Sequence, residues 1–344
     1  MPARLEAALS WLPESGDAPL AAIFSLSGPE LTKEEAALLA KTNPLGVILF
    51  QRNIESPVRL KTLINEIRNT LNRQCPVLID QEGGRVARLR KPNWFEIPAA
   101  KHFGDLYEQS PKLARTEIEK AYGTLADEML EMGIDVNCAP VQDIMYEHTH
   151  RSVGDRIYSS RPEVVAQCGH LVCEQFIKRG VTPVIKHMPG LGRADLDTHE
   201  ALPRIPTAKE GLLQTDFKPF MALTDKNYAR FLWGMTTHFL YTKIDPDLPA
   251  SVSPTIIGDI IRGDIGFDGF LISDDIDMNG MIDISPNFAN VEKRALAALN
   301  AGTDAVLYCS GHLKDMDVLG RTLPRLSDKA LSRLSEGQSQ NPVS

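Results

Sequence analysis

Cysteine is scarce in this chain, and the few cysteines form no recognisable framework. There are five of them, Cys75, Cys138, Cys168, Cys173 and Cys309, and no two make a Cys-x-x-Cys pair. Several lie in or beside apolar runs, which is typical of buried free thiols rather than of disulfides. We therefore expect five free thiols in a reducing compartment and predict a cytoplasmic location.

Long apolar runs and an excess of basic residues are also missing. No apolar run approaches the roughly 20 residues that span a bilayer. Residues 1–17 hold three acidic side chains and no basic region followed by an apolar core, so we predict no secretory signal. The 37 basic and 45 acidic residues give a net charge of −8 and a pI of about 5.6. This balance argues against nucleic acid or a membrane surface as the main partner.

Sequence motifs for zinc and for dinucleotides are absent as well. The first predicted strand carries no His-x-His, and no His-Glu-x-x-His occurs, which disfavours a zinc hydrolase. No Gly-x-Gly-x-x-Gly turn follows an early strand, as a doubly wound sheet that binds a dinucleotide would require. We therefore expect no metal site and disfavour the open sheet.

The chain does contain a regular alternation of short apolar runs and amphipathic runs, within an ordinary composition of 43% hydrophobic and 24% charged residues. The apolar runs predict strands at 20–26, 46–50, 76–80, 135–140, 181–185, 231–237, 270–273 and 305–309. Helical spacing follows at 30–41, 57–71, 112–132, 162–179, 209–223, 254–264, 287–301 and beyond 309 to about 334, with a loop reaching about 104 after the third strand.

Strands that are apolar throughout predict a parallel sheet covered on both faces. Eight strand–helix repeats in a chain of this length fit a (β/α)8 barrel. We therefore predict an α/β protein with one TIM-barrel domain over 1–344, its core at about 18–335 and a C-terminal tail at 337–344.

Polar residues cluster where the predicted strands end, and in such barrels the active site lies at the C-terminal ends of the strands. Five strand ends contribute, through Asp80 to Arg85 with Arg88, Asp143 with Gly154 to Arg156, Lys186 with His187, His238, and Ser273 to Asp275. Acids, cations and imidazoles of this kind match the hydroxyl groups of a neutral polyhydroxylated ligand. We therefore expect a small saccharide-like molecule as the partner.

The loop after the fifth strand carries an acid and an imidazole two residues apart. Pro189, Gly190 and Gly192 disfavour helix and strand, so a loop is predicted. Asp197 and His199 follow in it, and in extended backbone that spacing puts both side chains on one side. A carboxylate beside an imidazole tunes it for proton transfer near neutral pH, which makes this pair a candidate catalytic pair.

Three long motifs, in this order along the chain, resemble the family 3 glycoside hydrolases. They are residues 80–88, residues 186–190 with 197–199, and residues 273–278. Within that family the chain is similar to the single-domain bacterial β-N-acetylglucosaminidases of peptidoglycan recycling, over about residues 23–309. The resemblance implies a TIM-barrel hydrolase that needs no metal or organic cofactor.

The resemblance also implies roles for individual residues. Asp274 would be the nucleophile that forms a covalent glycosyl-enzyme, and His199, paired with Asp197, would be the general acid/base. The hydroxyls of a terminal N-acetylglucosamine would be held by Asp80, Arg88, Arg156, Lys186 and His187. The substrate would be N-acetylglucosamine linked to 1,6-anhydro-N-acetylmuramic acid, with or without a stem peptide, and the anomeric configuration would be retained.

One position departs from the family pattern and keeps two alternatives open. The loop of the family usually reads Pro-Gly-His-Gly, whereas here Leu191 takes the third place. An impaired sugar-binding homologue is therefore one alternative. A phosphorolytic enzyme on the same scaffold is the other, because a neutral His near the anomeric carbon repels an incoming phosphate less than a carboxylate does.

Overall fold

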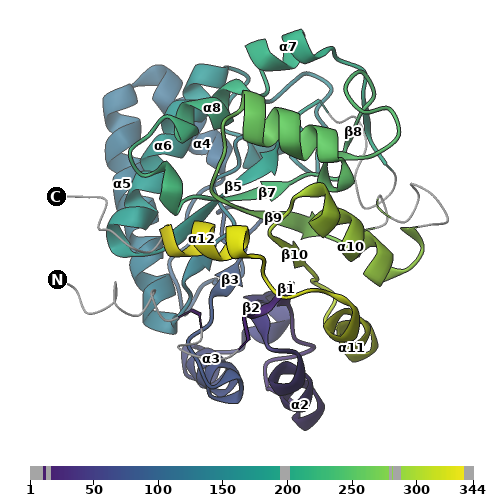
Figure 1. Ribbon diagram of the computed structural model, residues 1–344. Helices are drawn as coiled ribbons and strands as arrows, with labels where there is room; N and C mark the ends of the chain where they lie inside the picture. The colour runs from purple at the N-terminus through teal and green to yellow at the C-terminus, as the bar shows by residue number, and fades with distance from the viewer. Residues whose placement is uncertain (1–10, 13–16, 194–201, 279–280, 282–287, 337–344) are drawn as a thin grey trace.

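The computed structural model describes residues 11–12, 17–193, 202–278, 281 and 288–336, and its centre is a closed barrel of eight parallel strands (Figure 1). Around the barrel the strands run in the order β1, β2, β3, β4, β5, β7, β9, β10, and β10 pairs with β1 to close it. Their bounds are Leu20–Phe24, Pro44–Leu49, Val77–Ile79, Val136–Asn137, Thr182–Met188, Trp233–Thr236, Phe270–Asp275 and Ala305–Leu307. The predicted (β/α)8 fold is confirmed.

Helices surround the barrel, and several begin and end where local chemistry dictates (Figure 1). The helices are α2 (Lys33–Thr42), α3 (Pro57–Leu71), α4 (Ala100–Gln109), α5 (Pro111–Met132), α6 (Pro162–Arg179), α7 (Lys209–Gln214), α8 (Lys218–Thr224), the π-helix η5 (Ile256–Asp264), α10 (Val291–Ala301), α11 (Leu313–Thr322) and α12 (Asp328–Glu336). Helix α5 starts after the capping side chain of Ser110 and ends at Gly133, whose φ of 90° favours glycine.

The structure corrects three of the predicted elements and adds one. Strand β5 continues to Met188, so Lys186 and His187 lie inside the strand rather than after it. Helix α4 begins within the segment predicted as a loop up to residue 104. The helix predicted at 209–223 is divided into α7 and α8. A small two-stranded sheet, β6 (Arg204–Ile205) with β8 (Leu240–Tyr241), was not predicted.

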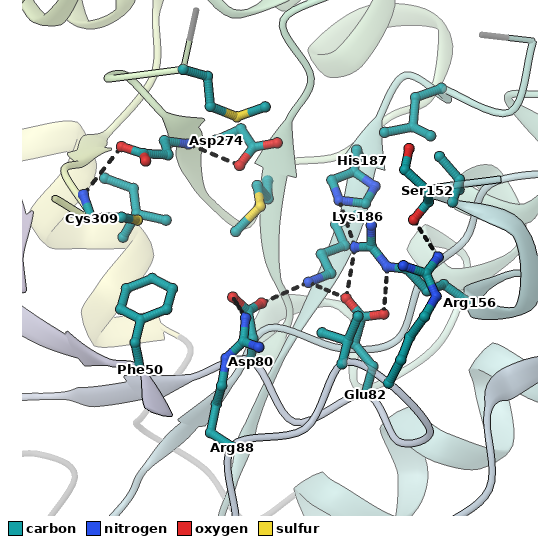
Figure 2. A pocket seen from close by; sticks show the side chains of 18 of the residues that line it. Phe50, Asp80, Glu82, Arg88, Ser152, Arg156, Lys186, His187, Asp274 and Cys309 are labelled. Atoms are coloured by element: carbon teal, nitrogen blue, oxygen red, sulfur yellow. Dashed lines mark hydrogen bonds and ion pairs between the residues drawn. The ribbon is translucent and has the colours of Figure 1, made fainter. Parts of the chain in front are cut away.

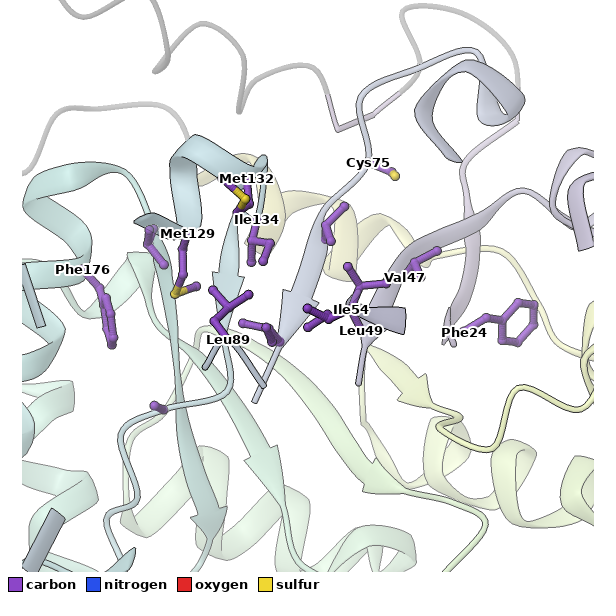
Figure 3. Packing of buried hydrophobic residues seen from close by; sticks show 14 of the residues in the cluster. Phe24, Val47, Leu49, Ile54, Cys75, Leu89, Met129, Met132, Ile134 and Phe176 are labelled. Atoms are coloured by element: carbon purple, nitrogen blue, oxygen red, sulfur yellow. The ribbon is translucent and has the colours of Figure 1, made fainter. Parts of the chain in front are cut away.

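Two kinds of apolar packing hold the barrel. Inside it, buried side chains such as Ile23, Ile48 and Ile272 form one cluster, which Trp11 and residues of α12 join. Outside it, side chains on the other face of the strands, such as Val47, form a second cluster that also contains helix side chains such as Met129 of α5 (Figure 3). Alternate residues of each strand therefore serve the interior and the helical layer.

Two further sequence expectations concern the cysteines and membrane-spanning segments. The five cysteines are free, as predicted. Four of them are buried, whereas Cys309 is partly exposed. Within the described ranges, no helix is long and apolar enough to cross a membrane.

Candidate active site

A polar cavity of about 430 Å³ opens at the C-terminal ends of the strands. Its walls come from several strand ends, among them Asp80 after β3, Lys186 and His187 of β5, and Asp274 of β9 (Figure 2). Arg88 and Arg156 also line it. These six side chains are the described residues to which the sequence assigns a role, and the fold brings every one of them to the same cavity.

The floor of the cavity is a network of buried ion pairs. Lys186 Nζ lies 2.8 Å from Asp80 Oδ1 and 2.7 Å from Glu82 Oε1. Arg156 donates two hydrogen bonds of 2.8 Å to the two carboxylate oxygens of Glu82. Arg88 lies further out, 3.5 Å from Asp80 Oδ2. Glu82 therefore compensates both the buried Lys186 and the partly exposed Arg156, and shares Lys186 with Asp80.

These pairs fix the charges of the network. Burial alone would raise the pKa of Asp80, but Lys186 and Arg88 outweigh it, and the pKa lies below its usual value. Burial likewise opposes ionisation of Glu82, and Arg156 and Lys186 hold its pKa well below its usual range. The two carboxylates in turn raise the pKa of Lys186 against the effect of burial. The network is thus ionised throughout at neutral pH.

Asp143 connects the imidazole of His187 to the backbone of Leu191, which follows strand β5. Its Oδ2 lies 2.8 Å from His187 Nδ1, and its Oδ1 accepts a 2.8 Å hydrogen bond from the backbone N–H of Leu191. Because a carboxylate only accepts, His187 carries a proton on Nδ1 and turns Nε2 toward Arg156, 3.5 Å away. This backbone bond holds Leu191 in place in the cavity wall.

Asp274 and Asp275 end strand β9 in different environments. Oδ1 of Asp274 accepts a 2.8 Å hydrogen bond from the backbone N–H of Asp275. Oδ1 of Asp275 accepts from the N–H groups of Asp277 and Cys309, each at 3.1 Å. Burial raises the pKa of Asp275 to about 6. The carboxylate of Asp275 is therefore occupied by the backbone, which leaves Asp274 as the better candidate for chemistry.

Two residues of the site carry no predicted role, although both stand in motifs visible in the sequence. Glu82 lies within the motif that follows the third strand, and Asp143 lies where the fourth strand leads into its loop. Their partners are distant in the chain, such as Arg156, which lies 74 residues from Glu82. Both count among the polar residues at the predicted strand ends, but no sequence signal pairs either of them with a partner so distant in the chain.

Asp197 and His199, the predicted acid/base pair, lie outside the described residues. In the described part of the chain, no group of three or more His, Cys, Asp or Glu side chains is arranged to hold a metal ion.

A (β/α)8 barrel with a polar cavity at its C-terminal mouth, lined by ionised carboxylates and cations, defines a barrel enzyme that acts on a polar small molecule. Residues 18–335 match the N-terminal domain of glycosyl hydrolase family 3. The chain belongs to this family.

Named relatives agree with this assignment. A β-hexosaminidase from Alkalilimnicola ehrlichii is 36% identical over 315 residues, covering 91% of this chain and 87% of the relative. Another from Idiomarina loihiensis is 33% identical, covering 94% of each chain. The structure of NagZ from Neisseria gonorrhoeae in complex with N-trifluoroacetyl-D-glucosamine superposes with a TM-score of 0.84 at 27% identity, covering 95% of this chain and 92% of that one. These comparisons confirm the family predicted from the sequence motifs and the enzyme class, a β-N-acetylhexosaminidase among the glycoside hydrolases.

Proposed function

We propose that this enzyme removes terminal, non-reducing β-linked N-acetylglucosamine from 1,6-anhydro-N-acetylmuramic acid, with or without a stem peptide, in cell-wall recycling. The single observation that carries the proposal is the position of Asp274, at the end of β9 in the wall of the same cavity as the Asp80–Lys186–Glu82 network. A carboxylate on a strand end is rigidly positioned, as a nucleophile needs to be. The β-hexosaminidase relatives support the choice of sugar.

The proposed reaction has two steps. The Asp274 carboxylate attacks the anomeric carbon while His199 gives its proton to the leaving oxygen, so that the glycosidic bond breaks and a glycosyl-enzyme forms. His199 then takes a proton from water, the water oxygen attacks the anomeric carbon, and the Asp274 carboxylate leaves. Asp197 would keep the imidazole of His199 in the required tautomer. Two inversions at one carbon give retention of configuration.

The sugar would be held by hydrogen bonds from the cavity floor. Asp80, Arg88, Arg156, Lys186 and His187 present charged donors and acceptors, which make stronger hydrogen bonds to hydroxyl groups than neutral partners do. The ion pairs among them hold the groups in place before the sugar arrives, so little ordering is needed on binding.

Two further expectations belong to the same proposal. The protein acts in the cytoplasm on a soluble muropeptide fragment. It works as one catalytic domain without metal or organic cofactor.

The proposal is tested with an aryl β-N-acetylglucosaminide and with the muropeptide disaccharide as substrates. We expect release of N-acetylglucosamine from both, with the β-anomer formed first in NMR spectra of the product. A sugar 1-phosphate formed only when phosphate is added would instead identify a phosphorolytic enzyme. Absence of turnover, together with tight binding of the sugar, would identify a binding protein.

The role of His199 is tested separately. His199→Ala should retain much of the first-step rate on an activated aryl glycoside but accumulate the glycosyl-enzyme, because the second step needs a base whatever the first leaving group was. Azide needs no deprotonation, so it should restore part of the turnover and give a β-glycosyl azide. Equal losses on good and poor leaving groups, without azide rescue, would remove His199 from the acid/base role.

A further inference from the structure

His238 follows strand β7 at the barrel mouth, and the reaction described above gives it no task. The imidazole is almost fully buried, with 1% of the residue exposed. Among the described residues that line the cavity His238 does not appear, so substrate has no direct access to it. A buried imidazole at this place can influence the reaction only through the residues that it contacts.

A chain of three hydrogen bonds runs from Ser251 through His238 to the proposed nucleophile. Ser251 Oγ lies 2.7 Å from His238 Nδ1, and His238 Nε2 lies 2.8 Å from the backbone oxygen of Asp275. The backbone N–H of the same Asp275 donates to Asp274 Oδ1 at 2.8 Å. The chain of bonds therefore runs from Ser251 through the imidazole and the backbone of Asp275 to the carboxylate that would attack the sugar.

The geometry selects one tautomer of the imidazole. A carbonyl oxygen only accepts, so the proton of neutral His238 stands on Nε2, and Nδ1 is left to accept from the Ser251 hydroxyl. Met281 Sδ, 3.5 Å from Ser251 Oγ, is the weaker acceptor for that hydroxyl. Burial lowers the pKa of His238, which keeps the ring neutral and leaves Nδ1 free to accept.

The side chain of Asp275 has hydrogen-bond partners of its own. Its carboxylate accepts from the N–H groups of Cys309 and Asp277, and Asp277 is itself fixed by a 2.9 Å ion pair with Arg294. Loss of the His238 bond would leave the backbone oxygen of Asp275 with the longer, 3.2 Å hydrogen bond from the backbone N–H of Met278, while the side chain stayed anchored. Residue 275 could then turn, and its N–H would move relative to the Asp274 carboxylate.

We propose that His238 is a positioning residue for the nucleophile: through the backbone of Asp275 it sets the orientation in which the Asp274 carboxylate meets the anomeric carbon. The inference rests on the proposed function of Asp274. Since His238 touches neither the sugar nor the reacting atoms, its loss affects the attack on the sugar and leaves binding of the sugar intact.

The test compares His238→Leu, which removes both ring nitrogens, with His238→Gln, whose side-chain amide can still donate near the position of Nε2. Misplacing a catalytic group by about 1 Å can cost roughly a hundredfold in rate, so we expect His238→Leu to lower kcat on an activated aryl glycoside by about tenfold or more. The affinity for an N-acetylglucosamine-like inhibitor should stay unchanged. His238→Gln should recover most of the loss, and azide should not.

His170→Leu is the matched control. His170 is a half-buried imidazole of α6 that contacts Tyr228 at 2.6 Å and does not line the cavity among the described residues. Its removal should leave kcat unchanged. A wild-type kcat for His238→Leu, or a loss matched by inhibitor affinity and shared with His170→Leu, would overturn the inference.

Two further measurements separate this inference from the proposed function and from misfolding. Normal hydrolysis by Asp274→Ala would refute the role of Asp274, whereas an inactive Asp274→Ala beside a normal His238→Leu would refute only the positioning role. If His238→Leu does not fold, ¹⁵N NMR of the wild-type imidazole still decides. We expect the proton on Nε2 at neutral pH, and a proton on Nδ1 instead would overturn the inference.

Discussion

At the level of single residues, the barrel mouth depends on carboxylates that compensate buried cations. The side chain of Glu82 is 5% exposed, and that of Lys186 is 2% exposed. Neither charge is stable in such a place without the other, because removing an ion from water costs several kcal/mol. Glu82 therefore determines whether Lys186 and Arg156 can be kept in the positions proposed for sugar binding.

Glu82→Gln should lower both stability and activity. The amide leaves Lys186 and Arg156 with one neutral partner in place of a carboxylate, and breaking a buried pair typically costs about 3–5 kcal/mol. Urea unfolding gives the change in the free energy of unfolding, and kcat/KM on an aryl glycoside gives the change in activity. Glu163→Gln is the control, because its pair with Arg161 is exposed and contributes little. Equal stability of the two variants would contradict the role given to Glu82.

Arg88 offers the cleanest test of sugar binding. Its contact with Asp80 is long, at 3.5 Å, and its buried Nε has no hydrogen-bond partner within the described residues. Hydrogen bonds to charged groups contribute about 1.5–3 kcal/mol, so Arg88→Met should weaken an N-acetylglucosamine-like inhibitor by about tenfold or more. Calorimetry measures the affinity, and the melting temperature should change little. Unchanged affinity would place the sugar elsewhere.

Asp275 should give a measurable pH dependence of stability. Its pKa is about 6 in the folded protein and 3.8 as an ordinary carboxyl. A raised pKa means that the stabilising contribution is complete below pH 3.8 and is lost as the pH rises through about 6. Asp275→Asn cannot ionise, so the melting temperature of the variant relative to wild type should rise between about pH 4 and pH 7. A difference that is flat across this range would contradict the raised pKa.

At the level of elements, sequence patterns predicted what depends on local chemistry and failed where distant contacts decide. The eight strands were recognisable from apolar runs. Helix α4 was not, because its N-cap residue Ala99 makes no side-chain cap and only Ala100, Phe103 and Gly104 of the helix are buried. The extension of β5 through Lys186 and His187 was also missed, since polar side chains in a strand interior are stable only beside partners such as Asp80 and Asp143.

Helix α4 positions the segment that carries Arg156, and Gly104 makes this possible. A Cβ at Gly104 would overlap the backbone oxygen of Tyr158, two residues after Arg156. Gly104→Ala should therefore push the segment away and cost about 1–3 kcal/mol or more through overpacking, with a loss of inhibitor affinity. Denaturant unfolding and calorimetry measure the two effects.

Gly258→Ala is the matched control for this change. Gly258 is also helical, in η5, but a Cβ added there would have nothing within 4 Å. Stability should be unchanged or slightly higher, because alanine restricts the unfolded chain. If Gly104→Ala were as stable and as active as Gly258→Ala, α4 would not be the support of Arg156.

At the level of the whole molecule, the two ends of the barrel perform different tasks. The mouth holds the charged cavity, and the opposite end is closed by α12, whose Ala330 and Leu334 join the apolar cluster inside the barrel (Figure 1). The division could be predicted from the fold class, because barrels place chemistry at the C-terminal ends of their strands. The residues that close the opposite end could not be predicted, because Arg262 and Arg333 do not belong to any recognisable sequence motif.

Asp304, just before β10, is the centre of that closed end. Its carboxylate lies 2.8 Å from Arg333 of α12 and 2.9 Å from Arg262 of η5, and it accepts a 2.8 Å hydrogen bond from the backbone N–H of Leu271 in β9. With 4% of its side chain exposed, it compensates two guanidinium groups that are themselves largely buried. One residue thus joins two helices and two neighbouring strands of the barrel.

Asp304→Asn should therefore lower stability without changing catalysis. The amide leaves Arg262 without its carboxylate partner and Arg333 with Asp268 as its remaining anion, 2.9 Å away. Breaking a buried pair in this way typically costs about 3–5 kcal/mol. Because the chemistry lies at the other end of the strands, kcat/KM measured well below the melting temperature should stay at the wild-type value. Glu82→Gln is the matched comparison, since it breaks a buried pair of similar type at the mouth and should reduce both quantities. A fall in kcat/KM for Asp304→Asn comparable to that of Glu82→Gln would mean that the two ends of the barrel are coupled, and that rigidity of the whole barrel, rather than the local ion pairs, sets the geometry of the cavity.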